Sequence, residues 1–232
     1  MSAQVRARLQ GAILPFVVVT GACATVPTAN PAGPLPKDQV AEVGGAGSAF
    51  VGYGNDGGTV PLDRVGGLAT VFGRVSFLDH IDVMAHLHGG GALGLGIDPK
   101  PAVAPTGLHH VYGGRLSLVF RTTVFQSLHV GGGFHVDYQE STLGAKLDRR
   151  VGALVSMPMS ERVFEDIFIT IRPTAGLYVP LYDGAATPFF GALECPIGFS
   201  WRTSKWFTVF AEGGYHPPSK GVVATGGASV SF

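Results

Sequence analysis

Histidine and serine are spaced in this sequence so that they could do chemistry together. His86 and His88 are two residues apart, and in an extended strand both side chains would point to the same face. Simple hairpin pairing would set His88 opposite Ser117, and Ser117 opposite His129. A His–Ser–His row is the arrangement of a nucleophile beside a general base, and paired imidazoles are ligands for zinc.

No sequence motif supports either chemistry. His109 and Asp137 would also face each other, but the chain has no HExxH, GxSxG or Cys-rich metal pattern. The runs Gly89–Gly91 and Gly131–Gly133 lie inside expected strands and precede no helix, which favours curvature of a sheet over phosphate binding. We therefore predict no catalytic residue, no metal site and no cofactor.

The histidines belong to a chain of strand-length segments. Alternating apolar and polar residues, separated by turn signals, predict ten strands, each longer than the ~9–11 residues that cross a bilayer. At 165–182, for example, Ile167, Ile169 and Ile171 fall on one face, and Thr170 and Arg172 on the other. The strands are expected near 39–54, 64–78, 82–97, 108–121, 124–139, 149–159, 165–182, 187–202, 206–216 and 220–232.

The connections between these segments differ in length. Short turns are expected at Arg121–Val124, Met159–Glu165 and Arg202–Trp206. The connections on the other side are generally longer and richer in Gly and Pro, and they are expected at Asn55–Asp63, Asp98–Gly107, Glu140–Asp148 and Asp183–Thr187. Short turns on one side and longer loops on the other are typical of outer-membrane barrels.

Composition favours a sheet that faces lipid. Sixteen basic residues balance sixteen acidic ones, so no net charge calls for nucleic acid. Charged residues make up 14% of the chain, and 35 residues are glycine. Beyond residue 20 no apolar run reaches the ~18 residues of a transmembrane helix. The sequence predicts an all-β protein, a transmembrane antiparallel up-and-down β-barrel of about ten strands (residues 39–232).

The first residues have the pattern of an export signal. Arg6 and Arg8 precede the short apolar stretch Gly11–Val19 and small residues, which predicts a signal peptide over residues 1–22. Gly21–Cys23 resembles a lipobox that would make Cys23 a lipidated first residue. The alternative is an ordinary A-x-A site with cleavage before Thr25. The Pro-rich segment 23–38 is predicted to be an extended periplasmic linker.

The end of the chain carries a family resemblance. The alternating segment Val222–Phe232, closing on the aromatic Phe232, resembles the C-terminal insertion signal of bacterial outer-membrane β-barrels. The resemblance implies a location in the bacterial outer membrane, contact with outer-membrane lipid, and recognition of Phe232 by the barrel-assembly machinery.

Inward-facing polar residues of both charges predict a lumen filled by ion pairs and hydrogen bonds, since ten strands are close to the size that side chains fill. The expected function is that of a non-enzymatic structural element, anchor or scaffold that binds protein partners through its loops. The alternatives are a narrow channel for small solutes, or a barrel enzyme acting on lipid or peptide. The expected lumen residues are Glu42, Arg74, Asp82, His86, His88, His109, Arg115, His129, His135, Asp137, Arg150, Asp166, Arg172, Glu194 and Glu212.

Overall fold

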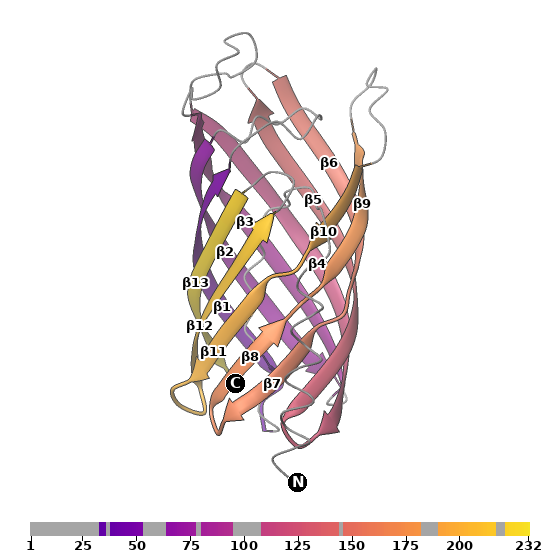
Figure 1. Ribbon diagram of the computed structural model, residues 1–232, viewed down its shortest axis with the longest axis vertical. Coiled ribbons are helices and arrows are strands. Elements are labelled where there is room, and N and C mark those ends of the chain that lie inside the picture. The colour runs from indigo at the N-terminus through magenta and orange to yellow at the C-terminus, as the bar shows by residue number, and fades with distance from the viewer. Residues whose placement is uncertain are drawn as a thin grey trace.

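The computed structural model describes residues 33–35, 38–52, 64–77, 80–94, 108–143, 146–181, 190–216 and 221–232. They form one closed antiparallel sheet, a tall barrel with tilted strands (Figure 1). No helix among these residues is long and apolar enough to span a bilayer. The strand segments are β1 (Ala41–Gly52), β2 (Arg64–Phe77), β3 (Ile81–Gly94), β4 (Leu108–Phe125), β5 (Leu128–Leu143), β6 (Lys146–Ser156), β7 (Met159–Phe164), β8 (Ile167–Ile171), β9 (Thr174–Pro180), β10 (Phe190–Glu194), β11 (Ile197–Arg202), β12 (Phe207–His216) and β13 (Gly221–Ser231).

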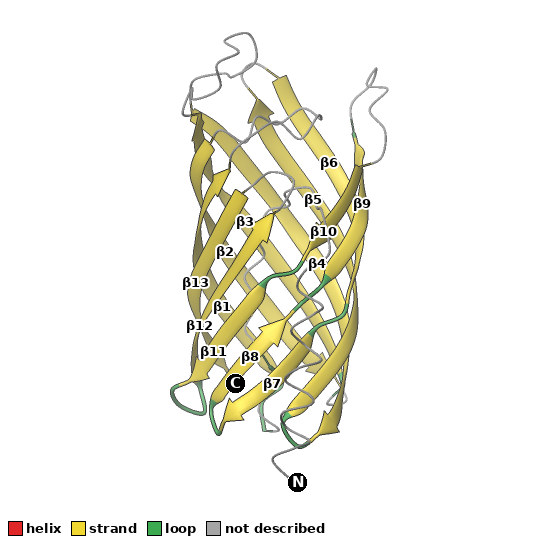
Figure 2. Ribbon diagram, viewed as in Figure 1, coloured by secondary structure: helices red, strands yellow, loops and turns green. Residues whose placement is uncertain are grey.

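Three of the membrane strands consist of two segments each. β6 and β7 are separated by Met157–Pro158, β8 and β9 by Arg172–Pro173, and β10 and β11 by Cys195–Pro196 (Figure 2). Neighbouring strands keep the same register on both sides of each break. Each pair of segments therefore counts as one strand, and the predicted ten-stranded antiparallel barrel is confirmed.

The three prolines are neighbours in the wall, and we call Pro158, Pro173 and Pro196 the proline seam. A hydrogen-bonded pair in an antiparallel ladder exchanges two bonds, but proline has no N–H to give. Each pair at the seam therefore keeps one backbone bond instead of two. The remaining bonds run from Gly131 N to Pro158 O (2.8 Å), from Met157 N to Pro173 O (2.9 Å) and from Arg172 N to Pro196 O (3.2 Å).

The barrel closes where its first strand meets its last. β1 pairs with β13 from Glu42↔Ser231 to Val51↔Val222. The backbone N–H groups of Val40 and Ala41 both donate to the carbonyl of Phe232, each at 3.0 Å. This pairing joins the two ends of the sheet, as a sheet surrounded by lipid requires.

Alternate residues of every strand point outward, and most of these residues are apolar, so the outer wall is apolar. Leu87, Phe134 and Val71 are among its most exposed side chains, at 66%, 62% and 60%. Such exposure would be costly in water, and it is the surface that a lipid bilayer solvates. The opposite residues of each strand point into the barrel, where most polar side chains are buried.

Two predicted turns are wrong in position. The segment Arg121–Val124 belongs to β4, and the chain turns at Gln126–Ser127 after a bulge near Phe125. Likewise β7 continues to Phe164, so that the turn is Glu165–Asp166. In the first case Arg121 is held in the strand by a lumen partner, because its Nε lies 2.8 Å from the carboxylate of Asp82.

The described turns at one end of the barrel are short, and β1 begins and β13 ends at that same end (Figure 1). At the other end the connections include residues 53–63 and 95–107. We assign the end with the short turns to the periplasm, because outer-membrane barrels have short periplasmic turns and longer outer loops.

Candidate functional site in the lumen

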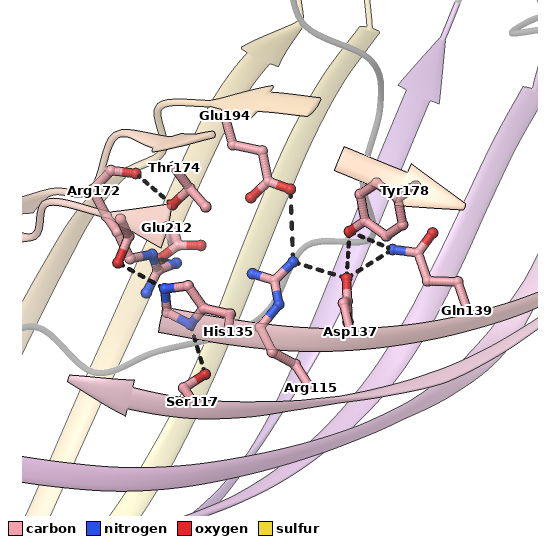
Figure 3. A network of polar contacts seen from close by, with 11 residues as sticks. Arg115, Ser117, His135, Asp137, Gln139, Arg172, Thr174, Tyr178, Glu194 and Glu212 are labelled. Atoms are coloured by element: carbon pink, nitrogen blue, oxygen red, sulfur yellow. Dashed lines mark hydrogen bonds and ion pairs between the residues drawn. The ribbon is translucent and has the colours of Figure 1, made fainter. Parts of the chain in front are cut away.

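The upper lumen holds a polar network around Asp137 of β5. Its Oδ2 accepts hydrogen bonds from Arg115 Nη2 of β4 at 3.0 Å, from Gln139 Nε2 at 3.1 Å and from the Tyr178 hydroxyl of β9. Figure 3 shows these side chains converging on the carboxylate. The side chain of Arg115 is 3% exposed and that of Asp137 1%. A buried carboxylate needs these hydrogen bonds and its ion pair, because removing one charge partner would lower the stability of the protein by roughly 3–5 kcal/mol.

This network crosses the barrel. Arg115 Nη2 also lies 3.8 Å from Glu194 Oε1 of β10. β4 is the fourth strand of the ring of ten and β10–β11 is the eighth, so the two residues come from nearly opposite walls. Their contact means that side chains bridge the lumen at this level.

The middle of the lumen holds a histidine between two serines. His135 Nδ1 shares a hydrogen bond with Ser117 Oγ at 2.8 Å, and its Nε2 shares one with Ser156 Oγ at 2.7 Å. All three side chains are buried. One imidazole nitrogen donates and the other accepts, so a neutral ring satisfies both contacts.

Beside His135, Arg172 and Glu212 form another ion pair, on the lumen side of the proline seam. Arg172 Nη2 donates to Glu212 Oε2 at 2.7 Å, from the seventh strand to β12. The hydroxyl of Thr174 donates to the carbonyl of Arg172 at 3.2 Å. Because Pro196 has no N–H to give to that carbonyl, Thr174 supplies a replacement donor.

The periplasmic level is built on Arg74 of β2. Its Nη2 lies 2.7 Å from Glu42 of β1, and its Nη1 lies 3.9 Å from Asp82 of β3. Ser229 donates to Glu42 at 2.5 Å, and Ser76 donates to Asp82 at 2.6 Å. Each carboxylate is thus held by an arginine and a hydroxyl, and all the charges are buried.

Large apolar side chains fill space between the polar levels. Phe72 of β2 and Phe210 of β12 pack edge to face, with ring centroids 5.8 Å apart. Tyr178 and Met84 are fully buried. Since β2 and β12 are not neighbours in the sheet, this contact also runs through the interior of the barrel.

The structure places the predicted lumen residues as follows. Arg150 and His129 are half-buried, and His129 Nδ1 shares a hydrogen bond with Thr123 at 3.0 Å. Asp166 is an exception, because it lies exposed in the periplasmic turn Glu165–Asp166. The side chain of His109 and all of Cys23 lie outside the described residues. The buried ones are Glu42, Arg74, Asp82, His86, His88, Arg115, His135, Asp137, Arg172 and Glu194, and Glu212 is nearly so.

The expected His–Ser–His row does not form. His88 is opposite Gly113, and Ser117 is opposite His135 rather than His88 or His129. His129 pairs instead with Thr123 and Ser160. The pairing of Ser117 with His129 depended on the predicted turn at 121–124, and moving that turn to 126–127 shifts the register of β4 against β5. The pairing of His88 with Ser117 fails separately, because β3 and β4 pair in a different register in which Ser117 is opposite Met84. Among the described residues, no three His, Cys, Asp or Glu side chains converge as metal ligands.

Two residues of the network were missed by sequence reasoning. Tyr178 and Gln139 fall on the inward face by alternation, but neither is charged and neither was taken as a site residue. The sequence feature that could have pointed to Tyr178 is Gly152 of β6. This strand lies between β5 and β9, and Gly152 is opposite both Asp137 and Tyr178. A glycine in a strand marks a close approach of another group, and here that group is the tyrosine ring.

Comparison with known proteins identifies the fold. No family model matches the chain, and no curated protein matches it. An outer-membrane channel from Pseudomonas putida F1 is similar with a TM-score of 0.59 at 10% identity, over 88% of this chain and 100% of that one. The translocator domain of the autotransporter NalP from Neisseria meningitidis gives 0.50 at 12% identity, over 99% and 96%. The chain therefore has the fold of bacterial outer-membrane β-barrels, and its apolar outer wall suits that membrane.

Proposed function

We propose that this outer-membrane barrel is a non-enzymatic structural element, anchor or scaffold whose lumen is closed, and that it meets protein partners through its outer loops. The observation that carries the proposal is the contact between Arg115 and Glu194 from nearly opposite walls. Below it, the pairs Arg172–Glu212 and Arg74–Glu42 occupy two further levels. A solute crossing the barrel would have to break buried ion pairs at each level.

Conductance tests this proposal. Purified protein inserted into planar bilayers is expected to give no steady current. A wide-channel porin inserted into the same bilayers serves as the positive control, because it shows that an open barrel would be detected. Steady, reproducible conductance from the unaltered protein would contradict the closed lumen and favour the narrow channel.

A second candidate, a barrel enzyme acting on lipid or peptide, has one observation in its favour. His135 bonded to Ser117 and Ser156 places a base beside two hydroxyls, which is how a serine nucleophile is activated. The burial of all three side chains favours a structural role instead. Ester or peptide hydrolysis by the purified protein that disappears in Ser117→Ala would establish the enzyme.

A further inference from the structure

Three arginines at the periplasmic mouth converge on two backbone carbonyls. Arg74 Nη1 donates to the carbonyl of Gly33 at 3.0 Å, and Arg121 Nη1 donates to the same carbonyl at 2.5 Å. Arg202 Nη2 donates to the carbonyl of Pro34 at 3.0 Å. Gly33 and Pro34, which fall in the segment 23–38, therefore contact side chains on the inner wall of the barrel.

These contacts place Gly33 near the barrel axis. Arg74 belongs to β2, the second strand of the ring, and Arg121 belongs to β4. Phe168, whose ring lies against Gly33, belongs to β8 in the seventh strand, and Arg202 belongs to β11 in the eighth. The second and seventh strands of a ring of ten are diametrically opposite. A residue that touches both spans the mouth.

The position requires glycine. Gly33 has φ +90°, a conformation that residues with a Cβ rarely adopt. A Cβ at Gly33 would lie 2.9 Å from Cδ1 of Phe168, and the guanidinium carbon of Arg202 lies over that same ring, 5.5 Å from its centroid. Any side chain at this position would be strained and would also meet the phenylalanine.

Two of the three arginines, Arg74 and Arg121, are already balanced in charge and can bind a neutral acceptor. The carboxylates of Glu42 and Asp82 lie within 2.7 Å of Arg74 and 2.8 Å of Arg121, respectively, so two acids balance two guanidinium groups. Their remaining N–H groups need acceptors but no further negative charge. Peptide carbonyls meet that need at Arg74 and Arg121, whereas a free anion there would add charge that Glu42 and Asp82 already supply.

We propose that Arg74, Arg121 and Arg202, with Phe168, form a binding site for a peptide that bends at a glycine, and that Gly33–Pro34 of the chain itself is its resident ligand. The same site takes a matching peptide added in trans once the resident segment is displaced. This proposal concerns the mouth of the barrel alone and is independent of whether the lumen conducts.

Thiol labelling tests the site. Ser160 lines the same small cavity as Gly33 and is buried. In a full-length chain with Cys195 replaced by serine, Ser160→Cys is expected to react slowly with a charged, water-soluble thiol reagent. Adding Gly33→Val should raise the rate by about tenfold, the effect expected from losing one to two hydrogen bonds.

The matched control is Gly47→Val. Gly47 lies in β1 on the outer face with no atom within 4 Å of the added Cβ, so the labelling rate should not change. Arg202→Met is a second way to displace the Gly33–Pro34 segment. It removes the hydrogen-bond donor to the Pro34 carbonyl and keeps an apolar side chain over Phe168. Mobility of the unheated, compact band on a gel shows that each variant is folded.

A synthetic peptide of residues 25–38 gives the decisive measurement. Added to the Gly33→Val chain, it should slow labelling of Ser160→Cys to the rate of the parent, and a peptide carrying Val in place of Gly33 should not. Unchanged labelling in both Gly33→Val and Arg202→Met would overturn the proposal. So would a failure of the peptide to protect the thiol.

Discussion

Tyr178 reaches over Gly152 to donate its hydroxyl hydrogen to Asp137, two strands away. A Cβ on Gly152 would lie 2.5 Å from Cε1 of the tyrosine ring. The hydrogen bond exists because the strand between the two residues has no side chain at this point. The polar network of the upper lumen therefore depends on a glycine that takes no part in it.

We expect Gly152→Ala to destabilise the barrel by about 1–3 kcal/mol, the usual cost of overpacking a filled interior. The measurement is the urea midpoint of the protein in lipid vesicles. Gly132→Ala is the control, because Gly132 faces outward and a Cβ there meets nothing within 4 Å. Equal midpoints for the two variants would show that the tyrosine moves aside at little cost.

Arg74 and Glu42 should be coupled in stability. Arg74→Met leaves the buried carboxylate of Glu42 without its charge partner, and we expect a loss of about 3–5 kcal/mol. Adding Glu42→Gln should recover part of that loss, because the unpaired charge is gone. Unfolding of the two single variants and the double variant gives the coupling energy, and additive losses would argue against the pair.

The proline seam should be the least protected part of the wall. Because each pair at Pro158, Pro173 and Pro196 keeps one backbone bond instead of two, amides beside it should open more easily than those of β2 and β3. Hydrogen exchange followed by mass spectrometry compares the two regions directly. Equal protection across the seam and across β2–β3 would show that side-chain contacts compensate for the missing bonds.

Phe232 should matter for assembly more than for stability. Its ring is 55% exposed on the outer wall, and its backbone caps β1. We expect Phe232→Ala to lower the amount of folded protein in the outer membrane, as the insertion-signal resemblance implies, with little change in the urea midpoint of the protein that does fold. Val230→Ala, on the same face of β13, is the control. A matched loss in both variants would assign the effect to lost apolar area.

The sequence was a good guide to the strands and a poor one to their register. Alternation such as that of Ile167, Ile169 and Ile171 marks an element locally, and the predicted strand ranges lie close to the observed ones. Register depends on where each hairpin turns, and the turn at Gln126–Ser127 carries little sequence signal. The partner of Ser117 was therefore assigned wrongly, although its inward direction was not.

Contacts across the lumen were beyond sequence reasoning for a different reason. Arg115 and Glu194 meet because the strands tilt as the barrel closes, which brings together positions that no hairpin pairing relates. Gly33 was likewise hidden, since a Pro-rich segment ahead of a barrel carries no pattern that distinguishes an inner position from an outer one. Its positive φ and its contact with Phe168 become visible only in three dimensions.

The position of Gly33 also sets an order of events in time. Its partners are supplied by β2, β4, β8 and β11, so its docking site does not exist until late strands have joined early ones. The segment is synthesised before every strand that it contacts, and it is among the last parts able to reach its final place. Docking of Gly33 thus reports that the second to eighth strands have curled around the mouth, and a barrel stalled before that stage would still carry this segment free.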